Sequence, residues 1–424
     1  MKLINLFIIS IALFFSTPEF AHCQWVQTSG PAGAFVTCFA IDGTNVASPN
    51  LFVGTPGSGV YLSTNNGSTW SPASGKLTTT SVHAFAVDST NASSPLLFAG
   101  TDGGGVFLST NNGTLWTAVN TGLANTFVQA LAINGARLIA GVADGAYLST
   151  NSGASWSAAS TGLGNASVLS LVMSSQGTSS PMLFAGTLAK GIFLSTDNGT
   201  SWKGVDTGLT ETTFQSLAVI GPNTSSPKIF AGTFGGGVFL STNNGTSWKA
   251  VNNGLTNTNV NCLAVSGTKL FAGTDSSGVF LSINNGTSWA PVNTGLVDLS
   301  INVVAVSQTN LFAGIFNEGV WKRTLSEMNS VSQNEQPVTF RLEQNYPNPF
   351  NPSTTISFVL AERGMVTLEV FDMLGRKIQT LIHGAIEAGQ HSTRFDAGNL
   401  PSGIYTASLT TNNVRREMKM VLGK

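Results

Sequence analysis

Short apolar runs alternate with clusters of Gly, Asn, Ser and Asp along most of the chain. In one stretch the runs cover residues 82–87, 96–101, 105–110 and 116–119, with turn-forming residues between them. Runs of this length, bounded by turn formers, are typical of β-strands. The pattern therefore predicts an all-β fold of short strands joined by tight turns.

This group of four strands is a repeat. The octet Ser-Thr-Asn-Asn-Gly-Ser-Thr-Trp at residues 63–70 recurs with small changes and ends at Trp116, Trp156, Trp202, Trp248 and Trp289. Successive Trp residues are 46, 40, 46, 46 and 41 residues apart. Four strands in a unit of this length predict the blades of a β-propeller, because the unit is too long for one coil of a β-helix.

The two ends of the repeat region are incomplete in complementary ways. Residues 25–28 look like the fourth strand of a unit, whereas residues 301–306, 311–315 and 319–324 look like the first three. Joining them completes a seventh blade and leaves no unpaired sheet edge. We therefore predict a seven-bladed propeller over residues 24–325, closed by its own N-terminal strand.

The octet resembles the Asp-box, Ser-x-Asp-x-Gly-x-x-Trp, of sialidase-like and sortilin-like propellers with BNR repeats. Asn fills the Asp slot as Asn65, Asn111, Asn151, Asn243 and Asn284, and Asp197 fills it once. The slot's oxygen is expected to accept backbone N–H bonds, Gly to take a positive φ, and Trp to pack beneath the turn. The resemblance implies that these boxes are structural and lie opposite the ligand-binding face.

Two cysteines share one slot of the repeat. Cys38 and Cys262 stand where other repeats carry Ala84, Ala130 or Ser170. Small apolar residues at this slot predict that both thiols are buried in the core rather than reactive.

After the repeats the composition changes. Residues 326–339 are polar and predict a linker. Three motifs follow: Leu-Glu-Gln-Asn-Tyr-Pro-Asn-Pro-Phe-Asn-Pro at 342–352, Val-Phe-Asp-Met-Leu-Gly-Arg at 370–376 and Leu-Pro-Ser-Gly-Ile-Tyr at 400–405. The strand pattern between them predicts a small immunoglobulin-like antiparallel β-sandwich of about seven strands.

Over residues 340–424 these motifs resemble the type A sorting domain of the type IX secretion system, the Por secretion tail. The resemblance implies that the type IX translocon of the outer membrane is a partner. It also implies that the linker is a place where related proteins are cleaved and then attached to lipopolysaccharide. The motif residues are Tyr346, Pro347, Asn348, Pro349, Phe350, Asp372, Leu374, Gly375, Arg376, Gly403 and Tyr405.

The N-terminus predicts an export signal. Lys2 is followed by an apolar run over residues 6–15, and Ala21 and Cys23 suit the −3 and −1 positions of a cleavage site. The run is too short to span a membrane as a helix. Cys23 as a lipoprotein cysteine is an alternative, although His22 is larger than the residue that such signals prefer. We expect residues 1–23 to be removed, no transmembrane segment in the mature chain, and a secreted or outer-surface location through Sec export and type IX secretion.

Charge and composition argue against several activities. The net charge is −1 and 9% of residues are charged, so no basic field favours nucleic acid. A sialidase needs three arginines around the substrate carboxylate, and the propeller region has Arg137 and Arg323. No Cys/His spacing fits a zinc site, and we predict neither a metal nor a cofactor. Asp102 and Asp275 occupy equivalent turns and are interpreted as solvated turn caps.

A polar column supports a binding role. The second residue of each first strand is Thr37, His83, Gln129, Leu169, Gln215, Asn261 and Asn302. First strands line the centre of a propeller, so these side chains should ring one mouth of the channel. His83, Gln129, Gln215, Asn261 and Asn302 are therefore our candidate ligand-binding residues. The alternative is a polar lining for a water-filled channel.

The predicted function is a non-catalytic surface or secreted module that binds glycan or protein, with loops 121–126 and 207–212 on one face. The main alternative is a glycoside hydrolase or lyase that uses Asp102, Asp275 or Glu211. A third is a structural envelope component. The fold does not decide among them.

Overall fold

The computed structural model describes residues 24–31, 33–43, 49–89, 95–174, 181–224, 226–328, 341–360, 364–386, 389–398, 400–411 and 414–423. The chain divides into two compact units, one ending at Ser330 and the other beginning at Val331. The predicted export signal and residues 329–339 of the predicted linker lie outside the described residues. Among the described residues, no helix has the length and apolar character needed to span a membrane.

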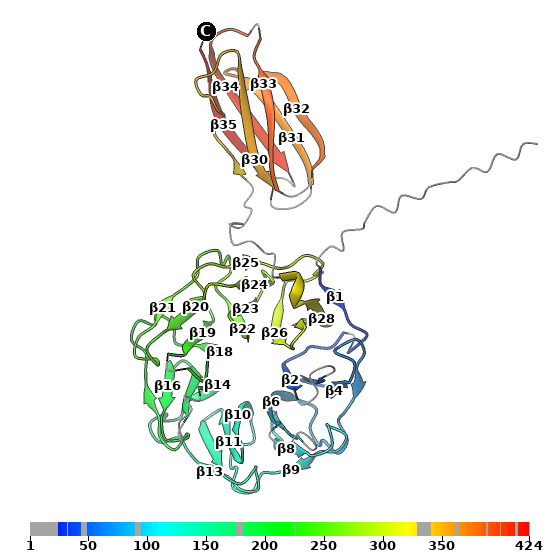
Figure 1. Cartoon of the computed structure of the whole chain (residues 1–424), viewed down its shortest axis with the longest axis vertical. Coiled ribbons are helices and arrows are strands. Elements are labelled where there is room, and N and C mark those ends of the chain that lie inside the picture. Colours follow the sequence, from blue (N-terminus) through cyan, green and yellow to red (C-terminus); the bar gives the residue numbers. More distant parts are fainter. Residues whose placement is uncertain are drawn as a thin grey trace, which may run out of the picture. The chain divides into compact units, whose positions relative to one another are not determined.

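The described residues of the N-terminal unit form seven four-stranded antiparallel sheets around a ring (Figure 1). Six sheets keep their strands in chain order: β2 (Cys38–Asp42), β3 (Asn50–Thr55), β4 (Gly59–Ser63), β5 (Ser71–Pro72); β6 (Val82–Asp88), β7 (Leu96–Thr101), β8 (Gly105–Ser109), β9 (Thr117–Ala118); β10 (Val128–Asn134), β11 (Arg137–Val142), β12 (Gly145–Ser149), β13 (Ser157–Ala158); β14 (Ser167–Ser174), β15 (Met182–Leu188), β16 (Ile192–Ser195), β17 (Lys203–Gly204); β18 (Phe214–Ile220), β19 (Lys228–Thr233), β20 (Val238–Ser241), β21 (Lys249–Ala250); β22 (Val260–Ser266), β23 (Lys269–Thr274), β24 (Val279–Ser282), β25 (Ala290–Pro291).

The seventh sheet closes the ring with both ends of the unit. It contains β26 (Ile301–Val306), β27 (Asn310–Ile315), β28 (Gly319–Thr324) and, from the N-terminus, β1 (Val26–Gln27). β1 pairs with β28 through Val26 opposite Lys322 and Gln27 opposite Trp321. The predicted seventh blade, assembled from residues far apart in sequence, is therefore confirmed. A 3-10 helix, η1 (Leu325–Met328), follows β28 and includes the first residues of the predicted linker.

Each blade has two distinct ends. In the second blade Thr101 pairs with Val82 and with Gly105, so the start of the first strand and the turn between the second and third strands share one end. The octet that begins at Ser109 lies at the other end, where Ser109 pairs with Leu97. We call these the strand-start face and the octet face of the propeller. The first strands β2, β6, β10, β14, β18, β22 and β26 form the inner ring (Figure 1).

The octets form hydrogen-bonded turns. In the second blade Asn111 Oδ1 accepts the N–H of Leu115 at 2.9 Å, and Ser109 Oγ accepts the N–H of Gly113 at 2.9 Å. Gly113 has φ +76° and Asn112 has φ +55°, a conformation that Gly and Asn tolerate best. Asparagine therefore caps this turn as the sequence predicted for the Asp slot.

The octet tryptophans join neighbouring blades. Trp116 donates its backbone N–H to Gly75 O and its indole N–H to Ala73 O, both at 2.8 Å and both in the preceding blade. The equivalent indole donors are Trp156 to Val119 O, Trp202 to Ala159 O, Trp248 to Val205 O and Trp289 to Val251 O. The sequence predicted that each octet tryptophan packs beneath its own turn. The structure adds that each of these side chains also anchors its blade to the previous one.

Cys38 and Cys262 are free and buried, as the repeat position predicted. Cys38 lies opposite Gly54 and Cys262 opposite Gly273, in equivalent registers of the first and sixth blades. Burial raises the pKa of both thiols to about 12. Both thiols are therefore neutral in the folded propeller at ordinary pH.

This pKa shift predicts how stability depends on alkaline pH. The neutral thiols stabilise the fold fully below the unfolded thiol pKa of about 8.5, and the contribution is lost as pH rises toward 12. The chain should therefore lose stability between pH 8 and 11 relative to a Cys38→Ala/Cys262→Ala variant, the matched control because Ala84 and Ala130 fill this slot in other blades. Urea unfolding at each pH measures the difference. A difference that stays constant with pH would contradict the prediction.

The C-terminal unit is a β-sandwich. Its described strands are β29 (Arg341–Leu342), β30 (Ser353–Leu360) and β33 (Gly389–Asp396) in one sheet, and β32 (Lys377–Ile386), β31 (Gly364–Asp372), β34 (Gly403–Thr411) and β35 (Val414–Leu422) in the other. Side chains of both sheets, among them Ile356, Phe395, Leu368 and Met420, meet in one core. The immunoglobulin-like prediction of about seven antiparallel strands agrees with this architecture.

Candidate functional site

The polar column of the propeller coincides with a row of β-bulges. In the third blade Val128 pairs with Val142 and Ala130 with Gly141, which leaves Gln129 as the extra residue between them. The same shift occurs at His83, Leu169, Gln215, Asn261 and Asn302. A bulge leaves its residue outside the ladder and redirects the side chain. The fold therefore gives this position a distinct orientation in blade after blade.

The column divides into two groups. Thr37 Oγ1 donates to Gly54 O at 3.0 Å and also bonds Val82 O, and Asn261 Nδ2 donates to Ile301 O at 3.0 Å. Val82 and Ile301 belong to the next blade, so these two side chains hold adjacent first strands together. The side chain of the predicted binding residue Asn261 is therefore engaged in a hydrogen bond between blades. Asn302 Nδ2 is buried and has no hydrogen-bond partner among the described residues.

The remaining candidates reach solvent. Gln129 and Gln215 are exposed and His83 is half-buried. Gln129 Oε1 accepts the Ser167 hydroxyl at 3.2 Å, and His83 Nε2 lies 3.1 Å from Ser81 Oγ. These side chains combine donors and acceptors at the strand-start face, because a neutral imidazole or an amide offers both.

Two of these residues line one hollow between the second and third blades. The hollow has a volume of about 60 Å³ and is lined by His83, Asp102, Phe127, Val128 and Gln129. This volume is well below the roughly 300–1,000 Å³ of usual ligand pockets, so the space suits one group of a ligand rather than a whole ligand. Its lining includes one carboxylate, that of Asp102.

Large apolar side chains are exposed on the same face. Phe127, just before β10, is 53% exposed, and Phe234, just after β19, is 55% exposed. Leu188 and Phe316 are exposed at positions equivalent to Phe234. Sequence reasoning missed these residues. The residue after the repeated Phe-Ala-Gly-Thr or Phe-Ala-Gly-Ile segment, aligned across repeats, could have revealed Leu188, Phe234 and Phe316.

The proposed catalytic carboxylates sit in solvated turns. Asp102 and Asp275 are exposed directly after β7 and β23, and their backbone N–H groups bond Ser81 O and Asn259 O at 2.9 and 3.1 Å. Glu211 is half-buried. The equivalence of the two turns agrees with their interpretation as repeated turn positions.

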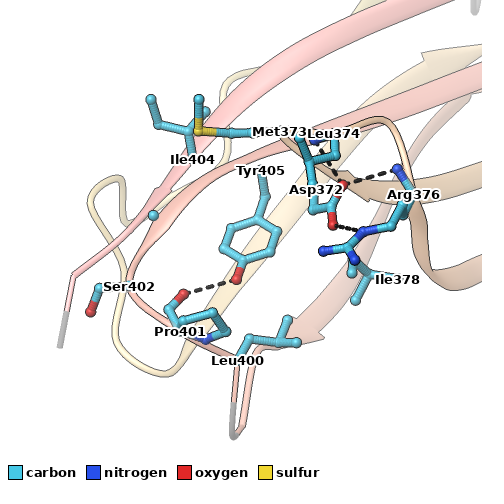
Figure 2. Close-up of a pocket in the computed structure, with 11 residues that line it drawn as sticks. Asp372, Met373, Leu374, Arg376, Ile378, Leu400, Pro401, Ser402, Ile404 and Tyr405 are labelled. Carbon is cyan, nitrogen blue, oxygen red and sulfur yellow. Dashed lines mark hydrogen bonds and ion pairs between the residues drawn. The ribbon is translucent and has the colours of Figure 1, made fainter.

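In the C-terminal unit two motifs meet around a pocket of about 360 Å³ (Figure 2). Five of the predicted motif residues line it: Asp372, Leu374, Arg376, Gly403 and Tyr405. They come together because Asp372 in β31 pairs with Tyr405 in β34. Gly375 lies in the turn after β31 with φ +74°. Residues separated in sequence therefore form a single surface.

The first motif lies at the same end of the sandwich. Phe350 is buried and forms an isolated β-bridge with Leu422. Leu422 also pairs with Gly403, which lines the pocket. Asn348 Oδ1 accepts the N–H of Val421 at 2.9 Å. Tyr346, Pro347 and Pro349 are exposed.

A buried amide next to this motif was not among the predicted residues. Asn345 donates through Nδ2 to Pro347 O at 3.0 Å and to Thr354 Oγ1 at 2.9 Å. It holds the proline-rich segment against β30.

Comparison with known families decides what the C-terminal unit is. Residues 344–423 match the family described as "Secretion system C-terminal sorting domain". The chain is a β-propeller with a type IX sorting tail. It is therefore a type IX-secreted protein of the cell surface or the extracellular space. No curated protein sequence matches the chain.

Solved structures support the propeller fold. A GH74 enzyme of Niastella koreensis is 15% identical, with a TM-score of 0.57 over 93% of this chain and 74% of its own. A GH74 xyloglucanase of Xanthomonas campestris is 15% identical, with a TM-score of 0.56 over 94% and 67%. The structure of YCF48 bound to D1 peptide is 12% identical, with a TM-score of 0.53 over 73% of this chain and 99% of its own.

The chain spans 48%, 58% and 63% of the length of three further solved structures that it matches. At such identities the likeness shows the fold and not the ligand.

The turn at Asp372 of the sorting domain is held by its own carboxylate. Asp372 accepts the backbone N–H groups of Leu374 and Arg376, each at 2.9 Å, and Arg376 Nε at 2.7 Å. The Arg376 N–H, together with its guanidinium, holds the pKa of the Asp372 carboxyl below its usual range. The carboxylate therefore stays ionised at neutral pH and keeps the turn closed.

Proposed function

We propose that the propeller is a non-catalytic module that binds an uncharged glycan on its strand-start face. The observation that carries the proposal is the combination of solvent-facing Gln129, Gln215 and His83 with exposed Phe127 and Phe234 on that face. Amides and imidazole can donate to and accept from sugar hydroxyls, while aromatic rings can cover the apolar faces of sugar rings.

The distribution of exposed apolar side chains also favours this face. Phe127, Leu188, Phe234 and Phe316 are exposed there, whereas the octets expose Leu115 and Ile283 as their large apolar side chains among the described residues. Exposed apolar groups near polar ones are a usual feature of interaction sites. The low charge of the whole chain, 9%, suits a neutral ligand better than an acidic one.

The fold itself supports both a sugar and a peptide as the ligand. The similar structures include a xyloglucanase and a protein bound to a peptide. The choice of a glycan therefore rests on the side chains of this chain. The exposed turn positions of Asp102 and Asp275 support binding over hydrolysis, because both are repeated turn positions that reach solvent.

The test is a double substitution. Screening the secreted full chain on a glycan array identifies the ligand, and calorimetry then compares it with a Gln129→Ala/Gln215→Ala variant. Each lost hydrogen bond costs about 0.5–1.5 kcal/mol, so the variant should bind roughly tenfold or more weakly. It should melt normally, since both side chains are exposed.

The matched control is Thr110→Ala/Thr242→Ala, which truncates two exposed polar side chains on the octet face. It should bind as tightly as the unchanged chain. Equal affinity of the glutamine variant would assign the column to channel lining. Release of hydrolysis products, abolished by Asp102→Asn or Asp275→Asn, would favour the glycoside hydrolase instead. Binding to peptides without glycans would overturn the choice of ligand.

A further inference from the structure

The pocket of the sorting domain has walls from two separate segments. One is the turn between β31 and β32, with Asp372 and Arg376, and the other runs from Leu400 to Tyr405 (Figure 2). Its volume of about 360 Å³ is within the range of pockets that hold a ligand group or a partner's side chain.

Both walls are pre-organised by hydrogen bonds. The Asp372 carboxylate fixes the first through the N–H groups of Leu374 and Arg376. Tyr405, itself buried, fixes the second by donating its hydroxyl to Pro401 O at 2.8 Å (Figure 2). A rigid surface loses little conformational entropy when a partner binds.

This rigid turn presents two adjacent apolar side chains to solvent. Met373 is 73% exposed and Leu374 is 78% exposed. Arg376 lines the same pocket with a side chain that is 74% exposed, and its bond to Asp372 uses Nε. The Nη groups can therefore receive a carboxylate from outside.

A sorting domain must be recognised by its secretion machinery, and large exposed apolar groups on a fixed frame are typical of sites that a protein partner covers. We propose that this pocket, with the Met373–Leu374 turn, is the surface that a protein of the secretion machinery binds. The partner inserts an apolar side chain between the two walls and places a carboxylate against the Arg376 guanidinium.

The test uses the full chain in a bacterium that has a type IX system. A Met373→Ser/Leu374→Ser variant should reach the surface or medium at least about tenfold less than the unchanged chain and accumulate as folded periplasmic protein. The matched control is Met365→Ser/Val414→Ser. Met365 and Val414 are also exposed, but they lie at the opposite end of the sandwich, where Val366 pairs with Thr411 and Thr411 with Val414. The control should be secreted normally.

The charge is tested separately at Arg376. The Arg376→Gln variant should stay in the periplasm. The Arg376→Lys variant should be secreted nearly as well as the unchanged chain, because it keeps a cation at the pocket. Melting of each purified chain checks that the sandwich remains folded. Normal secretion of a folded Met373→Ser/Leu374→Ser variant, or equal retention of the control, would overturn the proposal. Normal secretion of Arg376→Gln would overturn the carboxylate contact.

Discussion

A chain truncated after residue 339 should accumulate in the periplasm and fail to reach the cell surface. The truncation removes the sorting domain at residues 344–423 and leaves the predicted export signal at residues 1–23 in place. The propeller should still fold, because its closing strand comes from Val26–Gln27 and the sandwich has a core of its own. The fraction on the surface or in the medium should fall to background.

Cell fractionation measures this result, and the melting temperature of the truncated propeller is the control. An unchanged melting temperature together with loss of display would show that the domain acts in sorting rather than in folding. Normal surface display of the truncated chain would contradict the assignment of residues 340–424 as the sorting signal.

Trp25→Ala should be among the most destabilising single substitutions in the propeller. Trp25 is 2% exposed, its indole N–H donates to Val292 O at 2.6 Å, and its backbone N–H donates to Thr294 O at 2.8 Å. Replacing a buried Trp with Ala typically costs about 3–5 kcal/mol. The closing strand β1 has two residues, so losing this anchor should also weaken its pairing with β28.

The comparison is Val26→Ala, at the next residue in the chain but 52% exposed, which should change stability by about 0.5 kcal/mol or less. Urea unfolding of the two variants gives the difference. If Trp25→Ala costs no more than Val26→Ala, the N-terminal closure contributes little to the stability of the ring.

The polar column shows a feature that the sequence determined only in part. Alignment of the repeats located His83, Gln129, Gln215, Asn261 and Asn302 in one slot. It could not show that the slot is a β-bulge, since a bulge depends on the pairing of two strands. It also could not separate residues that bond the next blade from those that reach solvent, because the acceptors are backbone carbonyls of another repeat.

The sequence by itself determined the strand period, the number of blades, the closure by residues 25–28, the octet turns and the nature of the tail. The strands and turns are local features, and the turn chemistry of Asn and Gly recurs unit after unit, so each repeat supports the others. The closure is not local, but the two incomplete end units complement each other and so reveal it in the sequence. The exposure of Phe127 and the pocket at Asp372 and Tyr405 were decided by tertiary structure. Both depend on which segments distant in sequence lie side by side, and sequence periodicity does not specify those contacts.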